Sequence, residues 1–275
     1  MSLRPQQQMP TGRPPMTYHP SAHAPTSPSA ANAIAPNTLI IGIDFGAYFE
    51  FQPTDFLLLG TTFTGCAIAH AAKVRDVTDK AKIAEHIEVL KRWPGAGNAS
   101  AEKTPTILAY DNDFIQVIAW GSSVTEQHRN RFAHFKLLLH RPAQGEPGSA
   151  TIDQITWEMQ STTINSSNSL PRGKTAVDVA ADYFRSLYAY VQNVLQNTYG
   201  EKFLAGQNLQ YVITVPALWS DRSKALTLRA ANEGGFTGKV TLVTEPEAAA
   251  VYCATLCDEV DLHVGSKFLG TSYSR

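Results

Sequence analysis

Two short segments in the first quarter of this 275-residue chain constrain its fold more than any other feature. Residues 39–46 read LIIGIDFG and residues 60–69 read GTTFTGCAIA. When the 14 residues 47–60 are left out, the join reads IGIDFGTTFTGCAIA. This is an apolar strand, a polar turn and a second apolar strand. We therefore predict paired strands over 38–46 and 61–70, interrupted by an anomalous insert over 47–60.

The turn of this hairpin carries residue types that suit phosphate binding. Gly46 and Gly60 lack a Cβ, which lets backbone N–H groups approach an anion closely. Thr61 and Thr62 add hydroxyl donors, and Asp44 can hold Mg²⁺ directly or through its waters. An ordinary hairpin with a polar turn would contain the same residues. The hairpin alone leaves both interpretations open.

Composition excludes several classes of protein. The net charge is −1, so we expect no nucleic-acid partner and no anionic-membrane partner. There is no signal peptide and no apolar run near 18 residues, so we expect a cytoplasmic protein, with the nucleus as the alternative. Cys66, Cys253 and Cys257 form no disulfide framework. No further ligands stand at suitable spacing, so we expect no metal site at the last two.

The N-terminal segment 1–37 differs from the rest of the chain. It holds eight of the 16 prolines and almost no large aliphatic residues. Such a segment cannot bury enough apolar surface to offset the entropy of ordering it. We predict a disordered tail over 1–37. Its PxxP patterns leave open a role as a ligand for a small adaptor domain.

Apolar periodicity predicts strands followed by a strand–helix alternation, which indicates a layered α/β domain. The predicted strands after the hairpin are 87–93, 104–110, 115–121, 209–219 and 239–243. The predicted helices are 122–140, 175–199, 221–233 and a last one that begins near Thr244. Ser220 can cap the third of these helices, and Thr244 with Glu247 fits a capping box for the fourth. Residues 71–84 fit a short helix or a loop, and 141–173 a loop with a weak strand.

One long ordered stretch carries a family resemblance. Residues 211–236 read YVITVPALWSDRSKALTLRAANEGGF and residues 240–252 read VTLVTEPEAAAVY. Together with the hairpin, this pattern resembles the ATPase domain of the 70-kilodalton heat-shock protein family, in the actin-like ATPase superfamily. The WPG, KTPT, WG and FKLLL segments resemble a divergent heat-shock-like branch common in fungi. The resemblance covers 38–269 without the insert and leaves 270–275 as a non-family end.

The resemblance implies a fold and a set of roles. The fold would be the first lobe of an actin-like ATPase, which is ribonuclease H-like. Asp44 would position Mg²⁺, and Thr61 and Thr62 would contact the β- and γ-phosphates of ATP. Glu245 would lie near the metal and the attacking water. Lys136 would orient that water or steady the γ-phosphate.

The resemblance also implies a nucleotide-sensing hinge at Pro216 with Lys224 as its basic partner. Simpler interpretations stay open for these residues. Glu245 can serve only to stabilise the helix dipole, Pro216 can simply end a strand, and Lys136 can be a solvated helix residue.

The family's activity is chaperone-type ATP hydrolysis with unidentified protein clients. The second phosphate turn and the adenosine-binding half do not follow within these 275 residues, so we expect impaired turnover. The alternative is a non-catalytic protein-binding remnant. We hypothesise that a splicing or gene-model error produced the insert and the end. We do not expect a P-loop NTPase, because Asn168 stands where the loop ending in Gly173-Lys174-Thr175 requires Gly and no strong strand precedes it.

Overall fold

The computed structural model describes residues 34–46, 63–75, 77, 80–140, 170–217 and 219–256. The chain divides into two units, Met1–Ile34 and Ala35–Arg275, and all described helices and strands belong to the second. The predicted insert, the non-family end and most of the predicted tail lie outside the described residues and stay predictions. No helix in the described part of the chain is long and apolar enough to cross a membrane.

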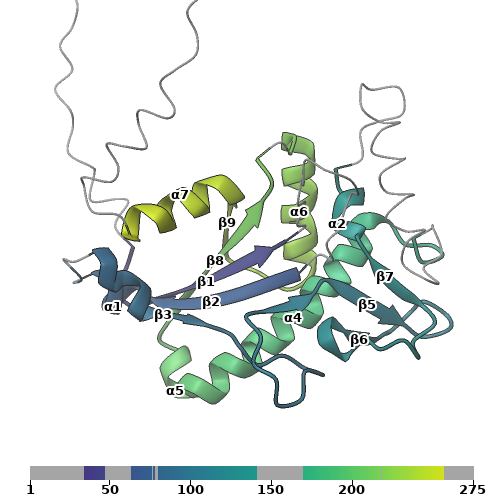
Figure 1. Ribbon diagram of the computed structural model, residues 1–275, viewed down its shortest axis with the longest axis horizontal. Coiled ribbons are helices and arrows are strands. Elements are labelled where there is room, and N and C mark those ends of the chain that lie inside the picture. The colour runs from purple at the N-terminus through teal and green to yellow at the C-terminus, as the bar shows by residue number, and fades with distance from the viewer. Residues whose placement is uncertain are drawn as a thin grey trace, which may run out of the picture. The chain divides into compact units, whose positions relative to one another are not determined.

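The main sheet has six strands and contains the predicted hairpin. Its strands are β1 (Thr38–Phe45), β2 (Phe63–His70), β3 (Ile87–Val89), β4 (Lys103–Pro105), β8 (Asn208–Val215) and β9 (Lys239–Thr244). The order is β3-β2-β1-β8-β9 (Figure 1). The sixth strand, β4, also pairs with β2. β1, β8 and β9 run parallel, while β2 is antiparallel to β1, β3 and β4. The carboxyl ends of β1, β8 and β9 therefore meet at one edge.

The hairpin register passes directly across the insert. Asp44 pairs with Gly65, and Phe45 pairs with Thr64. The N–H of Gly46 donates to the carbonyl of Phe63 at 3.1 Å. Sixteen residues, 47–62, separate these two positions in the sequence. The pairing that the joined sequence predicts is confirmed.

The remaining described elements are helices and a small second sheet. The helices are α1 (Ala71–Arg75), α2 (Phe135–Leu138), α4 (Ala176–Tyr199), α5 (Glu201–Leu204), α6 (Asp221–Glu233) and α7 (Glu245–Leu256), with 3₁₀ turns η2 (Lys80–His86) and η3 (Gly121–Ser123). The second sheet has the order β6-β5-β7, from β5 (Ile107–Tyr110), β6 (Val117–Trp120) and β7 (Arg131–Ala133). The predicted mixed α/β architecture is confirmed.

Capping explains where the long helices begin. The Oγ of Ser220 accepts from the N–H of Ser223 at 3.3 Å at the start of α6. At α7, the N–H of Thr244 donates to Glu247 at 2.8 Å, and the N–H of Glu247 donates back to the Thr244 hydroxyl at 3.3 Å. Each bond satisfies a backbone group that the helix leaves unpaired. Both predicted caps are confirmed.

The predicted helix over 122–140 is wrong. Residues 131–133 form β7, which pairs with β5, and only the single turn of α2 is α-helical. His134 has φ of 60°, a left-handed conformation that interrupts a right-handed helix. The predicted strand over 209–219 also ends early, because Pro216 has no N–H to continue the β8 ladder.

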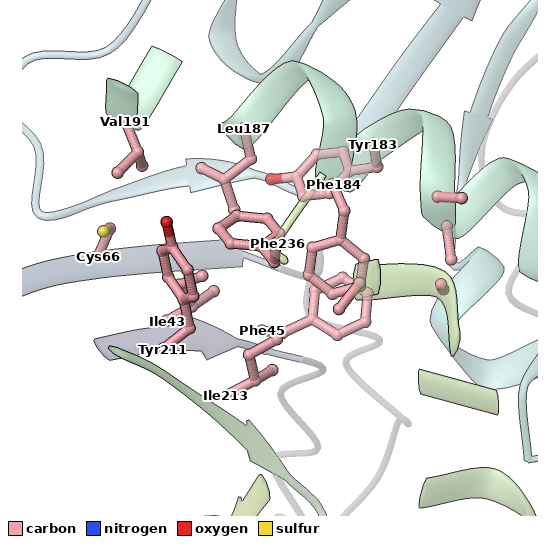
Figure 2. Close-up of a cluster of buried hydrophobic side chains, with 14 of the residues drawn as sticks. Ile43, Phe45, Cys66, Tyr183, Phe184, Leu187, Val191, Tyr211, Ile213 and Phe236 are labelled. Atoms are coloured by element: carbon pink, nitrogen blue, oxygen red, sulfur yellow. The ribbon is translucent and has the colours of Figure 1, made fainter. Parts of the chain in front are cut away.

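The hydrophobic core lies between the main sheet and α4. Residues at odd-numbered positions of β1 are almost completely buried: Leu39, Ile41, Ile43 and Phe45. Figure 2 shows Ile43 and Phe45 of this set together with Tyr183, Phe184, Leu187 and Val191 of α4. Ile213 of β8 stands opposite Ile43 in the parallel pairing of the two strands. Successive strand residues point to opposite faces. The even-numbered Asp44 therefore points to the other face of the sheet, on which α7 lies.

Replacing Leu187 with Ala tests the importance of this core. Leu187 is 0% exposed, and truncating such a side chain leaves a cavity that costs about 2–5 kcal/mol. We expect the free energy of unfolding in urea to fall by that amount. Ile118→Ala is the control: the side chain is 56% exposed, so the change should stay within about 0.5 kcal/mol. Equal effects of the two substitutions would contradict this description of the core.

Deleting residues 47–60 tests the hairpin register. The deletion leaves two residues, Thr61 and Thr62, between Gly46 and Phe63, where 16 stand now. Shortening the loop from 16 residues to two halves its length three times, and each halving lowers the entropic cost of closing the loop by about 0.6 kcal/mol. We expect the free energy of unfolding to rise by up to about 2 kcal/mol in a denaturant titration. A glycine–serine linker of the same length as 47–60 should leave stability unchanged, and a deletion that prevents folding would refute the register argument.

Candidate functional site

A cavity of about 550 Å³ opens at the edge where β1, β8 and β9 end. Its lining residues are Asp44, Gly46, Phe63, Lys103, Thr214, Glu245, Ala248 and Ala249. In layered α/β domains, ligands bind beyond the carboxyl ends of parallel strands. The volume lies within the range of about 300–1,000 Å³ that is typical of small-molecule sites. This cavity is the candidate functional site.

The Asp44 carboxylate is hydrogen-bonded on both oxygens. The Thr214 hydroxyl donates to Oδ1 at 2.8 Å, and the Lys103 ammonium donates to Oδ2 at 2.7 Å. Thr214 faces this side of the sheet because its neighbours Ile213 and Val215 face the core. The ion pair is partly open to solvent, since the Lys103 side chain is 52% exposed and that of Asp44 is 38% exposed.

Lys136 is the most unusual residue next to the site: it does not line the cavity, and it is an ionisable side chain that is 0% exposed. Its ammonium donates to the carbonyl of Phe45 and to Oε1 of Glu245, the latter at 3.3 Å. The Nζ also lies 5.2 Å from the ring centroid of Phe45 and 5.3 Å from that of Trp219. Burial lowers the pKa of Lys136, and the Glu245 and Asp44 carboxylates partly oppose that shift.

Glu245 is the first residue of α7, where a carboxylate interacts favourably with the helix dipole. The side-chain cap of this helix is nevertheless made by Glu247 with Thr244. Glu245 reaches Lys136 instead, and its side chain is 37% exposed. The two carboxylates in the first turn therefore do different things: one caps the helix, and the other pairs with the buried ammonium at the cavity.

The structure brings together several of the residues that the sequence analysis selected. Asp44, Gly46 and Glu245 line one cavity, and Lys136 contacts Glu245. Gly60, Thr61 and Thr62 lie outside the described residues, so their predicted contacts with phosphate stay predictions.

The two residues of the predicted hinge lie near this edge of the sheet. Pro216 directly follows β8, and its carbonyl accepts from the N–H of Trp219 at 3.2 Å. Lys224 lies in α6, where its ammonium is 4.0 Å from Oδ1 of Asp221. The role of this pair as a hinge stays a prediction.

Sequence reasoning missed Lys103 and Thr214. β2 pairs Gly65 with Asp44 on one side and with Lys103 on the other. Residues directly opposite each other share a face of the sheet, so Asp44 and Lys103 meet across the side-chain-free Gly65. That juxtaposition depends on the pairing of β4 with β2, which no local sequence pattern reveals. For Thr214, the alternation of side chains between the two faces of β8 was the signal that sequence reasoning could have used.

The donors present suit an anion better than a divalent cation. Mg²⁺ requires near-octahedral oxygen ligands and usually takes one or two carboxylates plus waters. Among the described residues, no group of three or more His, Cys, Asp or Glu side chains is placed to hold a metal ion. Asp44 already pairs with an ammonium, so the site as it stands does not fit Mg²⁺ there. Lys103, by contrast, has further N–H donors available for a phosphate.

Comparison with known proteins gives two similar relatives, heat shock 70 kDa protein 12A of Homo sapiens and of Mus musculus. The chain is 24% identical to each over 233 residues, which covers 78% of this chain and 30% of each relative. No protein-family model matches the chain. The chain therefore spans about 30% of the length of these relatives. The similarity supports a distant relationship to the heat-shock 70 type of ATPase domain.

The buried Lys136 predicts a specific pH dependence of stability. Its pKa is lower in the folded chain than in the unfolded chain, so between the two values only the unfolded chain holds the proton. The contribution of Lys136 to the free energy of unfolding therefore rises with pH across that window. Lys136→Met removes this rise. In urea titrations from neutral to alkaline pH, we expect the wild type to gain stability relative to this variant.

The control for this experiment is Lys202→Met, because Lys202 is exposed on α5. Its stability curve should run parallel to that of the wild type over the same pH range. A parallel curve for Lys136→Met as well would contradict the shifted pKa.

Proposed function

We propose that the cavity at the edge of the main sheet binds the phosphate end of ATP, in a domain with the actin-like, ribonuclease H-like fold. The observation that carries the proposal is the fully buried Lys136 beside the cavity. Burying an ammonium group is costly even when it is paired. Charged groups kept in such surroundings next to a cleft are typical of functional sites.

The arrangement around Lys136 supports the same proposal. The end of β1, the start of β2, the end of β8 and the start of α7 converge on one cavity that is lined by Asp44, Lys103 and Glu245. Ammonium and hydroxyl donors from separate strands surround a common space, as binding of a multiply charged anion requires. The similarity to heat shock 70 kDa protein 12A favours a nucleotide over other anions.

The proposal includes ATP hydrolysis only because of the similarity to heat shock 70 kDa protein 12A. In-line attack of water on the γ-phosphate requires positioned donors and a group that orients the water. We assign the first role to Lys136 and the second to Glu245. Gly46 and Gly60, with the hydroxyls of Thr61 and Thr62, would complete the phosphate cradle. Coupling through Pro216 and Lys224, and the binding of protein clients, belong to the same proposal.

A second candidate function is protein binding without nucleotide. It is favoured by the exposed apolar side chains of α7, where Val251 is 66% exposed and Tyr252 is 56% exposed. Exposed apolar groups of this kind occur at protein interfaces. Nucleotide binding separates the two candidates, because only the first requires it.

Calorimetric titration of the 275-residue chain with ATP tests the proposed function. We expect saturable binding, weakened by at least about tenfold in Lys136→Met, because this substitution leaves the Glu245 carboxylate at the cavity without its paired ammonium, and the carboxylate then repels the phosphates. Lys202→Met, which removes an exposed ammonium on α5, should bind like the wild type. Absence of ATP binding by the wild type, both with EDTA and with Mg²⁺, would refute the proposal and favour the second candidate.

A further inference from the structure

We propose that the Lys103 ammonium takes the place of a divalent cation at Asp44, so that this site binds polyphosphate without metal. The inference rests on the proposed function and names the cation that serves the site. The observation behind it is that both carboxylate oxygens of Asp44 accept hydrogen bonds. Lys103 donates to one of them at 2.7 Å and Thr214 to the other at 2.8 Å.

The backbone builds this ion pair into the sheet. Asp44 and Lys103 both stand opposite Gly65, one on β1 and the other on β4. A Cβ placed on Gly65 would lie 3.8 Å from the Cβ of Asp44 and 3.5 Å from the Cγ of Lys103, so the two side chains flank the glycine closely. The pairing of the strands therefore places the Lys103 side chain next to the Asp44 carboxylate. The pair does not depend only on a chance rotamer of a long side chain.

The negative charge of Asp44 is neutralised by a cation that belongs to the chain itself, the ammonium of Lys103. An unpaired Asp44 carboxylate would repel a phosphate, and the ammonium of Lys103 removes that repulsion. Glu245 is paired with Lys136 in the same way. Each of these two carboxylates therefore has a lysine of the chain as its partner.

Lys103 can serve Asp44 and a phosphate at the same time. An ammonium has three N–H donors, and Asp44 accepts one of them. The Lys103 side chain is 52% exposed and lines the cavity, so the remaining donors are accessible to a ligand. A bound phosphate would contact the same ammonium that neutralises Asp44, which is the bridging position a metal ion holds between carboxylate and phosphate.

A divalent cation at Asp44 would have to displace Lys103. Mg²⁺ demands near-ideal octahedral geometry at about 2.0–2.1 Å, and the ammonium already occupies the Oδ2 side of the carboxylate. Removing the ammonium should therefore have two opposite effects. Polyphosphate binding without metal should weaken, and Asp44 should become free to hold Mg²⁺.

Calorimetric titrations with ATP and with inorganic tripolyphosphate, in EDTA and then in Mg²⁺, test the inference on the full 275-residue chain. For the wild type, we expect dissociation constants that agree within about threefold between the two conditions. Lys103→Met should lose at least about tenfold in affinity in EDTA. Mg²⁺ should restore much of that loss. Lys103→Arg, which keeps a cation, should bind in EDTA.

Lys91→Met is the matched control. Lys91 is also about half exposed, at 54%, and its ammonium pairs with Glu102 at 3.2 Å. It is not among the residues that line the cavity. This variant should bind like the wild type in both conditions. Circular dichroism of every variant checks that the fold is kept, which substitutions at such exposed lysines should not disturb.

The outcomes separate this inference from the proposed function. Wild-type binding that requires Mg²⁺ overturns the inference and leaves the proposed function standing. Unchanged binding by Lys103→Met in EDTA also overturns the inference. Absence of binding in both conditions overturns the proposed function, and the inference falls with it. Metal-independent binding by the wild type that is lost in Lys103→Met supports both.

Discussion

The contact between β1 and α4 is the constraint on which the rest of the structure depends. Leu39, Ile41, Ile43 and Phe45 all face α4 and are at most 1% exposed. A slip of β1 by one residue would turn this whole set away from the core and bring Asp44 into it. Burial of the odd-numbered side chains therefore also determines where the only acidic residue of β1 points. The position of the site is a consequence of core packing.

The core and the site share Phe45 and Lys136. The ring of Phe45 packs against Phe184 with centroids 4.7 Å apart, and its carbonyl accepts a hydrogen bond from Lys136. The ammonium thus satisfies a backbone group at the last residue of β1 while it holds Glu245 of α7. An apolar residue of similar size could fill the space near Trp219 without the cost of burying a charge. Stability alone therefore does not explain a lysine at this position.

Local sequence signals predicted the elements better than they predicted the site. Capping residues and period-3.6 spacing located α4, α6 and α7, because those features act within a few residues. The helix expected over 122–140 failed because 131–133 pair with β5, a partner more than 20 residues away along the chain. Lys103 was missed for the same reason. Its meeting with Asp44 is produced by pairing among β1, β2 and β4, which is a tertiary effect.

The contacts of Lys136 connect the candidate site to residues outside the cavity. One ammonium joins the end of β1, the start of α7 and the Trp219 ring, which lies between β8 and α6. In the proposed function, a phosphate that drew this ammonium toward the cavity would lengthen its hydrogen bonds to Phe45 and Glu245. Pro216 and Trp219 stand in the same connection, joined by a backbone hydrogen bond. In that proposal, displacement of Lys136 would change its contact with Trp219 in the β8–α6 connection, whereas the strands of the sheet are held by ladder hydrogen bonds.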